Sequence, residues 1–338
     1  MSESKNVPHR VVNVGELLAE GDPFVDFPEG FEGLNFSGLP QNLLERLITK
    51  PRLARYRAAI AAALAARKGS AIISHMPVMT AAVATASKLL SRQPPHLAFS
   101  FNFTNLPVGR RLNYFRSAVQ NVTHFCVYSE YERELYADYF GLDISQITSV
   151  TWSQAKPLVG ERPAPLPAKS YVSAIGGEGR DYETLLKAAR LLPHIKFLLV
   201  TRPHNVNQIL PSNVILYNNV TPEITWRIAA DSAVVVVPLE ADTTCCGHIT
   251  LVGAQLLGLP LITTRSEATK EYTASPGVKT CAPGDHVALA ELIAEMHSNW
   301  ETEQAKAQAE VGRNTRLYDR SQWANVVSTF LRQHVVTP

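Results

Sequence analysis

Two glycine-containing segments in the second half of the sequence could bind an anion. Gly176-Gly-Glu-Gly-Arg180 follows an apolar run and places Arg180 in a loop. The residues Gly247, His248, Ile249 and Thr250 open an apolar helical pattern. A helix that begins there directs free N–H groups and its positive dipole end at a phosphate, and the Thr250 hydroxyl can add a hydrogen bond. Arg180 could then neutralise the charge of a diphosphate.

Other polar residues of this half also follow apolar runs. Arg202 comes after one run, and Asn219 comes after the next. Glu240 and Asp242 lie on the loop shortly before Gly247. If the runs are parallel strands, the carboxyl ends of the strands meet at one edge of a sheet, where ligands bind in open α/β folds.

The first half has its own candidates after predicted strands. His75 follows a short buried run, and Asn102, Thr104 and Asn105 follow the next. Their neutral groups suit sugar hydroxyls. The alternatives are a histidine satisfied at a strand end and a loop of turn-forming polar residues.

Two further patterns have structural interpretations. Ser129 and Glu132 have the Ser-x-x-Glu spacing of a helix capping box, which favours a structural role. Lys50–Lys68 is a basic stretch around alanines and leucines. Such a helix could rest on anionic lipid, although its mostly alanine apolar part would insert weakly. The alternative is a solvated helix face.

Strands and helices alternate along the whole chain. The first half predicts strands at 10–18, 70–74, 96–101, 124–128 and 147–151, and helices at 50–68, 79–90, 110–121 and 131–140. The second half predicts strands at 171–175, 196–201, 214–216, 233–238 and 260–264, and helices at 182–191, 221–231, 249–257, 286–296, 301–311 and 321–334.

This alternation predicts an α/β protein of two Rossmann-like, doubly wound domains that face each other across a cleft. Residues 1–155 form the first domain. Residues 156–169 contain four prolines and are predicted to be a stiff linker. Residues 170–312 form the second domain, and the helix in 313–338 is expected to cross back to the first.

Residues 173–188 resemble the opening strand, loop and helix of the C-terminal domain of two-domain (GT-B) glycosyltransferases. Residues 234–264 resemble the nucleotide-sugar site of these enzymes, most closely in the retaining family-4 type used for bacterial polysaccharides. The resemblance implies that Arg180 and the 247–250 helix start bind the donor diphosphate. It places Arg202 and Asn219 near the nucleotide, Glu240 or Asp242 at the donor sugar, and His75 near the sugar.

The sequence departs from that family at three positions. Gly253 and Cys245 stand where the family has a pair of glutamates, and the second of these glutamates holds the ribose hydroxyls. Gly177 stands where the family usually has an arginine. These departures imply a divergent subfamily or a site that has lost catalysis.

Composition and charge bear on nucleic-acid binding, the cellular compartment and metal binding. The 338 residues have a formal net charge of +2, which is too small for a protein coated by nucleic acid. Four cysteines without a CxxC pair, and a polar N-terminus, favour the reducing cytoplasm. No Asp-x-Asp pair or ligand cluster suggests a metal, and no cofactor is expected besides the donor substrate.

The leading hypothesis is a metal-independent hexosyltransferase that uses a nucleotide diphosphate sugar and a saccharide or lipid-linked acceptor. An inverting enzyme would need a base, for which Asp26 and His75 are the candidates. The alternative is a non-catalytic GT-B partner subunit that activates a true transferase. A sugar-nucleotide epimerase would need an internal acid and base pair, which the sequence does not indicate.

Overall fold

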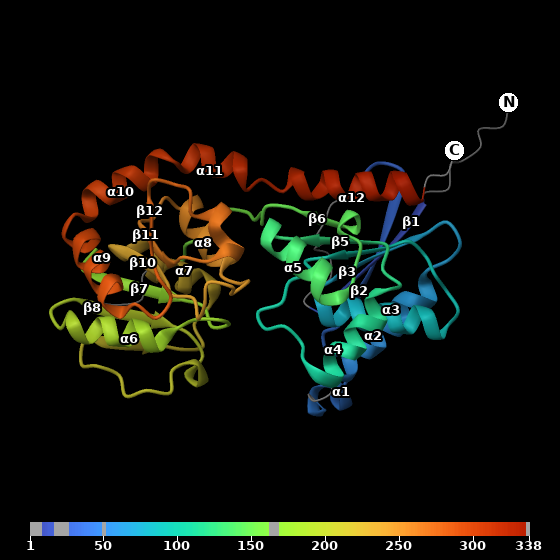
Figure 1. Ribbon diagram of the computed structural model, residues 1–338, viewed down its shortest axis with the longest axis horizontal. Coiled ribbons are helices and arrows are strands. Elements are labelled where there is room, and N and C mark those ends of the chain that lie inside the picture. The colour runs from blue at the N-terminus through green and yellow to red at the C-terminus, as the bar shows by residue number, and fades with distance from the viewer. Residues whose placement is uncertain (1–8, 17–26, 49–51, 162–168, 336–338) are drawn as a thin grey trace. The chain divides into compact units, whose positions relative to one another are not determined.

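The computed structural model describes residues 9–16, 27–48, 52–161 and 169–335 (Figure 1). Contacts divide the chain into two compact units. Unit 1 holds the described residues up to Val150 together with the last helix, and unit 2 runs from Thr151 to Arg320. Within the described ranges, every helix is too short or too polar to traverse a lipid bilayer.

Unit 1 contains a six-stranded parallel sheet in the order β2-β1-β3-β4-β5-β6. Its strands are β1 (His9–Gly15), β2 (Phe31–Ser37), β3 (Ala71–His75), β4 (His96–Phe99), β5 (His124–Val127) and β6 (Ile147–Ser149). Five of them match predicted strands. The sequence prediction missed β2, an edge strand whose residues are only partly buried or exposed.

The helices of unit 1 connect these strands. They are α1 (Leu43–Leu47), α2 (Leu53–Ala65), α3 (Pro77–Leu89), α4 (Gly109–Val119), α5 (Glu130–Phe140) and the final α12 (Ser321–His334), with a 3₁₀ turn at Ile144–Gln146. The helix α12 belongs to this unit, where Trp323 packs edge-on against Phe99 at 5.2 Å. In Figure 1, α12 covers one face of the sheet and α2, α3 and α4 cover the other.

The basic stretch predicted at residues 50–68 contains the helix α2. Its alanines form the buried face, whereas Tyr56, Ile60 and Leu64 are 45–49% exposed. Among the predicted cations, Arg55 pairs with Glu16. Lys50 lies outside the described residues.

Unit 2 contains a second six-stranded parallel sheet, in the order β12-β11-β10-β7-β8-β9. Its strands are β7 (Tyr171–Ile175), β8 (Lys196–Val200), β9 (Val214–Tyr217), β10 (Val234–Val237), β11 (Leu261–Thr264) and β12 (Val278–Cys281). The short edge strand β12 was not predicted.

The helices of unit 2 follow the predicted positions with one exception. They are α6 (Tyr182–Leu191), α7 (Pro222–Asp231), α8 (His248–Leu256), α9 (His286–Ser298), α10 (Trp300–Ala309) and α11 (Val311–Leu317), with 3₁₀ segments at Pro203–Asn205 and Glu267–Tyr272. The sequence prediction missed α11. Thr221 caps α7 and Pro222 occupies its first turn, both common at the start of a helix.

Helices cover both faces of the unit 2 sheet, and the residues of β10 show it. Val234 and Val236 join the core under α6 and α9, whereas Val235 and Val237 join the core under α7 and α8. Successive side chains of a strand point to opposite faces, so a run of buried valines requires two covered faces.

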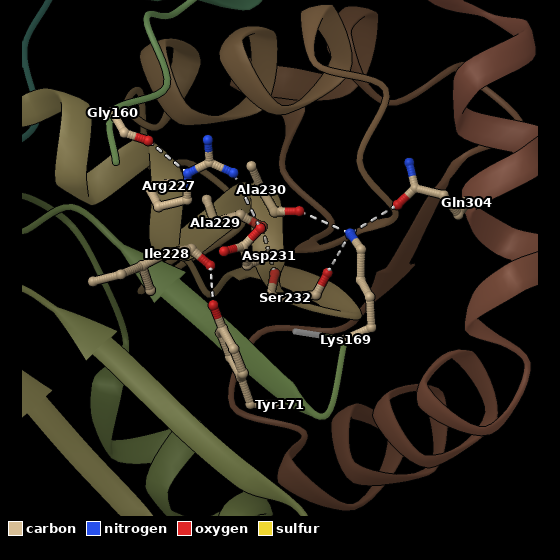
Figure 2. Close-up of polar contacts among 10 residues, drawn as sticks. All are labelled: Gly160, Lys169, Tyr171, Arg227, Ile228, Ala229, Ala230, Asp231, Ser232 and Gln304. Carbon is tan, nitrogen blue, oxygen red and sulfur yellow. Dashed lines mark hydrogen bonds and ion pairs between the residues drawn. The ribbon is translucent and has the colours of Figure 1, made fainter. Parts of the chain in front are cut away.

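The described part of the proline-rich segment is attached to α7 of unit 2 (Figure 2). Arg227 Nε donates to the carbonyl oxygen of Gly160 at 2.7 Å. Beyond residues 162–168, Lys169 Nζ donates to the carbonyl oxygens of Ala230 at 2.8 Å and Ser232 at 3.1 Å. A cation at the carbonyl end of a helix offsets the negative end of its dipole. Both flanks of residues 162–168 therefore hold α7 in place.

Candidate functional site

The loops that follow β7 and β10 meet at the edge of the unit 2 sheet. These two strands are neighbours, but the chain continues from β7 towards β8 and places β10 on the opposite side. An isolated antiparallel bridge joins Arg180 to Leu239 across the two loops. A reversal of strand order of this kind is where open α/β sheets bind ligands.

Arg180 lies beside the start of α8. Its Nη2 atom is 3.3 Å from Oγ1 of Thr250, and its Nη1 atom is 3.5 Å from Sγ of Cys246 and 3.1 Å from the carbonyl oxygen of Glu178. Its Nε atom is buried and has no hydrogen-bond partner among the described residues. The guanidinium therefore contacts only neutral protein groups among the described residues, and its positive charge is not paired with a carboxylate there.

The helix α8 begins at His248, directly after Gly247. Gly247 has φ +103°, a conformation that side chains rarely adopt, so glycine permits the turn into the helix. The N–H groups of His248 and Ile249 have no intrahelical acceptor by geometry, whereas Thr250 N–H donates to the Gly247 carbonyl at 3.0 Å. Ile249 is exposed here and Thr250 is buried. The structure therefore brings Arg180 and the helix start together.

A cavity of 370 Å³ lies next to this site. Backbone of the glycine-rich loop forms one wall, and residues after β8 and β9 form the others. The polar lining residues are Glu178, Thr201, Arg202, Asn205, Asn218, Asn219 and Thr225. Amides and hydroxyls dominate this lining, which suits a neutral ligand with several hydrogen-bonding groups.

Asn205 explains why position 177 is glycine. A Cβ on Gly177 would lie 2.5 Å from Nδ2 of Asn205, so a side chain there would displace Asn205. Asn205 in turn donates to Oγ1 of Thr201 at 2.8 Å. The sequence analysis did not identify Asn205, because nothing in its local pattern shows that it fills the space above a glycine 28 residues earlier.

The two candidate carboxylates lie on the loop between β10 and α8. Glu240 and Asp242 are both exposed. The backbone of the loop is fixed, since Glu240 N–H donates to the Gly179 carbonyl at 3.3 Å and Asp242 accepts from Glu267 N–H at 2.7 Å. Their side chains remain in solvent, so a contact with the donor sugar stays a prediction.

His248 and Cys246 are buried beside Arg180. Burial lowers the pKa of His248 to about 4, so its ring is neutral near pH 7, and it packs edge-on against Tyr272 at 4.8 Å. Burial raises the pKa of the Cys246 thiol, and Arg180 opposes the shift. Neither side chain adds negative charge to the site.

The place of the expected second glutamate is filled by an aromatic ring. A Cβ on Gly253 would lie 2.2 Å from Cη2 of Trp226 and 2.9 Å from Nε2 of Gln154. The other expected position, Cys245, is buried. The wall formed by α7 and α8 is therefore packed with protein atoms at Gly253.

In unit 1, His75 lies at the carboxyl end of β3 and is 5% exposed. Its Nε2 atom is 2.7 Å from Oδ1 of Asn13, and its ring packs edge-on against Phe99. Burial lowers the pKa of His75 to about 3. His75 is therefore neutral and enclosed, which fits the alternative interpretation of a histidine whose hydrogen bonds are satisfied at a strand end. Asp26, the other candidate base, lies outside the described residues.

The other unit 1 candidates differ in their environment. Asn102 Nδ2 donates to Oε1 of Glu132 at 2.6 Å, whereas Thr104 is partly buried and Asn105 is exposed. Ser129 caps α5 by accepting from Glu132 N–H at 3.2 Å, so the predicted N-cap is present without the reciprocal bond of a capping box. Glu132 Oε2 accepts from Tyr128 N–H at 3.0 Å. This cluster ties the loop after β4 to α5.

Two findings bear on metal and redox chemistry in the part of the chain that the structure describes. No group of three His, Cys, Asp or Glu side chains is placed to hold a metal ion there. All four cysteines are buried free thiols.

Sequence comparison gives no relative. No protein-family model matches the chain, and no protein with a curated description matches it either.

Solved structures share the fold over nearly the whole chain. HepE of Anabaena in complex with UDP-glucose has 13% identity and a TM-score of 0.70, with 96% of this chain and 99% of that chain covered. Sucrose-phosphate synthase of Thermosynechococcus elongatus has 14% identity and a TM-score of 0.67, with 96% and 98% covered. The UDP-forming α,α-trehalose-phosphate synthase of Burkholderia vietnamiensis has 12% identity and a TM-score of 0.68, with 96% and 100% covered.

These identities are low, so the likeness shows the fold and not the activity. The predicted fold class is confirmed: the chain has two doubly wound α/β units, the fold of these two-domain glycosyltransferases.

Proposed function

We propose that this chain is a glycosyltransferase that moves a hexose from a nucleotide diphosphate sugar to a saccharide or lipid-linked acceptor. The observation that carries the proposal is Arg180, whose buried Nε lacks a partner among the described residues, at the start of α8 beside the 370 Å³ cavity. Structural neighbours that bind UDP or UDP-glucose support it.

The donor would bind entirely to unit 2. The nucleoside occupies the cavity, where the amides of Asn205 and Asn219 and the exposed Arg202 offer hydrogen bonds. The diphosphate sits between Arg180 and the first N–H groups of α8. Glu240 or Asp242 reaches the hydroxyls of the sugar.

This arrangement would stabilise the leaving group. When the bond between the anomeric carbon and the phosphate oxygen breaks, its electron pair stays on the nucleoside diphosphate. Arg180 and the positive end of α8 face that growing charge, which is the condition for electrostatic catalysis. A guanidinium and a helix N-terminus supply this charge without a divalent metal, so we propose a metal-independent reaction.

On the acceptor side, we propose that Thr104 and Asn105 contact the acceptor. Asn102 and His75 already have hydrogen-bond partners within unit 1, so they are better suited to hold the loops in place. The product would be a polysaccharide or glycoconjugate made in the cytoplasm. For a lipid-linked acceptor, the surface around Lys50–Lys68 would make a peripheral contact with the membrane.

The test is thermal unfolding of the purified chain with UDP, GDP, ADP, dTDP and their sugars. A ligand that binds only the folded state raises the melting temperature. At a ligand concentration of a hundred times Kd, the free energy of unfolding rises by about 2.7 kcal/mol. We expect one nucleotide to shift it. If none does, the donor site is wrong.

Turnover separates the enzyme from the partner-subunit alternative. The same donor is incubated with saccharide and lipid-linked acceptors, and release of the nucleoside diphosphate is measured. Donor binding with release in the presence of one acceptor supports a transferase. Donor binding without release, in every acceptor extract, contradicts it in favour of a non-catalytic subunit.

A further inference from the structure

The middle of unit 1 has a one-sided charge. Between Glu45 and Glu130 the sequence holds twelve Lys and Arg residues and no Asp or Glu, in a chain whose net charge is +2. This stretch forms α2, α3 and α4, and α3 packs against both of the others. Figure 1 shows the three helices together on one face of the sheet. Glu16 pairs with Arg52 and Arg55, and Glu45 pairs with Arg57, so the remaining cations give this layer a smaller net positive charge.

A cavity of 540 Å³ opens within this stretch. The loops before β3 and β4 line it, with Arg67, Lys68, Ser70, Arg92 and Pro94 among the lining residues. These loops enter the amino ends of the strands. The cavity is thus at the opposite edge of the sheet from His75 and Asn102, and it adjoins the surface around Lys50–Lys68.

Among the described residues that line the cavity there is no carboxylate to balance its cations. Arg92 Nη1 donates to the carbonyl oxygens of Ala63 at 3.3 Å and Ala66 at 2.9 Å, and also to that of Leu64. Arg92 therefore offsets the negative end of the α2 dipole. Arg67 and Lys68 are exposed and have no ion pair within the described ranges, so their charges remain for a ligand.

Neighbouring strands do not cancel this charge. Val11 pairs with Ala71, which puts Arg10 next to the start of β3, while the register partner of Arg10 on β2 is Glu32. Of the described carboxylates at this edge, Glu29 and Glu32 lie before or within β2, which β1 separates from β3, and Asp143 lies before β6, which β4 and β5 separate from β3.

The walls of the cavity are fixed by hydrogen bonds. Ser70 N–H donates to the Arg67 carbonyl at 3.0 Å, and Arg67 N–H donates to Ser70 Oγ at 2.8 Å. Gly69 has φ +80°, which closes this turn. Opposite it, the Pro95 carbonyl accepts from Ile72 N–H at 2.9 Å. A site that is already ordered loses less entropy when it binds a ligand.

Exposed leucines flank the cavity. Leu64, one turn before Arg67, is 49% exposed, and Leu89, three residues before Arg92, is 80% exposed. Cations next to exposed apolar side chains are the combination that binds the interface of an anionic bilayer. A free phosphate ester would need the cations but not the leucines.

We propose that this cavity binds the phosphate group of an anionic lipid headgroup, with Arg67 and Lys68 as its cationic ligands and with Leu64 and Leu89 against the acyl boundary. The site extends the membrane contact proposed above. It lies in unit 1 and its test reads lipid binding, so its failure is distinct from a failure of donor binding in unit 2.

The experiment is sedimentation of the full chain with phosphatidylcholine vesicles that contain or lack phosphatidylglycerol. The test variant is R67A/K68A. The matched control is R110A/R111A, which removes two exposed cations from the same acid-free stretch but at the opposite end of the strands, at the start of α4. All of these side chains are exposed, and circular dichroism checks that both variants fold.

We expect anionic vesicles to bind the wild type, R67A/K68A to lose about tenfold in apparent affinity, and R110A/R111A to lose about threefold or less. Equal losses of affinity in the two variants would contradict the cavity as the binding site, since the total positive charge would then explain binding. If the wild type does not bind anionic vesicles, the proposal that the ligand is a lipid headgroup is wrong.

A second arm titrates glycerol 3-phosphate into the protein without vesicles, by calorimetry. Soluble binding that is lost in R67A/K68A keeps the cavity as a phosphate site but assigns it to a free phosphate ester. If neither vesicles nor glycerol 3-phosphate bind, the proposal is wrong.

Discussion

Units 1 and 2 reverse strand order at equivalent places, but they use the polar residues there differently. In unit 1 the reversal lies between β1 and β3, where His75 and Asn13 share a 2.7 Å hydrogen bond and Asn13 also donates to Asn35 at 2.9 Å. In unit 2 it lies between β7 and β10, where Arg180 has one ordinary hydrogen bond, to the Glu178 carbonyl at 3.1 Å, two longer contacts, and an unpartnered Nε within the described residues.

The next loops repeat this difference. After β4 in unit 1, Asn102 is bonded to Glu132, whose carboxylate also accepts from Tyr136 and Tyr128. After β8 and β9 in unit 2, Asn218 and Asn219 line an open cavity. A polar residue at the end of a strand is therefore weak evidence for a ligand. The stronger evidence is whether the protein has already used its hydrogen bonds.

The largest expected effect is on unit 1, where Glu132 should make stability depend on pH. Burial raises its pKa from 4.5 to about 7, against the opposing hydrogen bonds from Asn102 and Tyr136. Below pH 4.5 Glu132 is protonated in both the folded and the unfolded protein, and its contribution to the free energy of unfolding is fully present. This contribution is lost as the pH rises through about 7. The loss amounts to about 3 kcal/mol.

Urea unfolding of wild type and Glu132→Gln across this pH range measures that loss. The variant cannot titrate at this position. The free energy of unfolding of the variant minus that of wild type should therefore increase by about 3 kcal/mol as the pH rises from 4.5 to about 7. The buried His75, His96 and His248 titrate alike in both proteins and cancel in the difference. Glu134→Gln, on the exposed side of α5, is the control. A constant difference between wild type and Glu132→Gln would mean that Glu132 is not held as a buried acid.

The second effect is on ligand binding in unit 2. Arg180→Ala should weaken binding of the nucleoside diphosphate found by thermal shift about a hundredfold, because a charge-assisted donor to phosphate is lost. Stability without ligand should change by about 1 kcal/mol or less, since Arg180 makes one hydrogen bond of ordinary length, to the Glu178 carbonyl at 3.1 Å, and two longer contacts. Calorimetric titration gives Kd for both proteins.

Arg190→Ala is the matched control, because Arg190 is an exposed arginine on α6 that donates to the Ile209 carbonyl away from the cavity. It should bind nucleotide like wild type. Equal Kd values for the Arg180 and Arg190 variants would remove the contrast between the two units, since Arg180 would then be as structural as His75.

The sequence predicted most elements because buried parallel strands and amphipathic helices have clear patterns. It missed β2 and β12, which are edge strands. Both interrupt their apolar residues with polar residues or glycine and lack the continuous apolar run of a central strand such as β10, whereas the other two edge strands, β6 and β9, were predicted. The separate α11 was missed because no proline or turn motif marks where α10 ends.

The site was predictable to the extent that topology alone places residues. Arg180 and Thr250 are 70 residues apart, but each follows a strand of the same sheet, so the sheet brings them together. Asn205 against Gly177 and Trp226 against Gly253 were not predictable. Those contacts depend on side-chain packing between elements, and a single sequence carries no pattern for it.

The smallest effect concerns the closed wall of unit 2. Gly253 lies within α8, where glycine costs about 1 kcal/mol relative to alanine. The structure explains this cost, because a Cβ would approach Cη2 of Trp226 to 2.2 Å. Overpacking of this kind costs 1–3 kcal/mol by the usual range, about 2 kcal/mol here. Gly253→Ala should therefore destabilise the protein by a net ~1 kcal/mol.

The sign should reverse when the ring is removed. In a Trp226→Ala background, Gly253→Ala meets less resistance and should stabilise the protein by up to about 1 kcal/mol, as measured by urea unfolding. Gly312→Ala in α11 is the control, since only Arg316 Nη1 comes within 4.0 Å of its Cβ, and it should not destabilise. If Gly253→Ala is stabilising in the wild-type background, Trp226 moves aside easily. The space over Gly253 would then be open to a ligand, and unit 2 would have a larger site than the cavity beside Arg180.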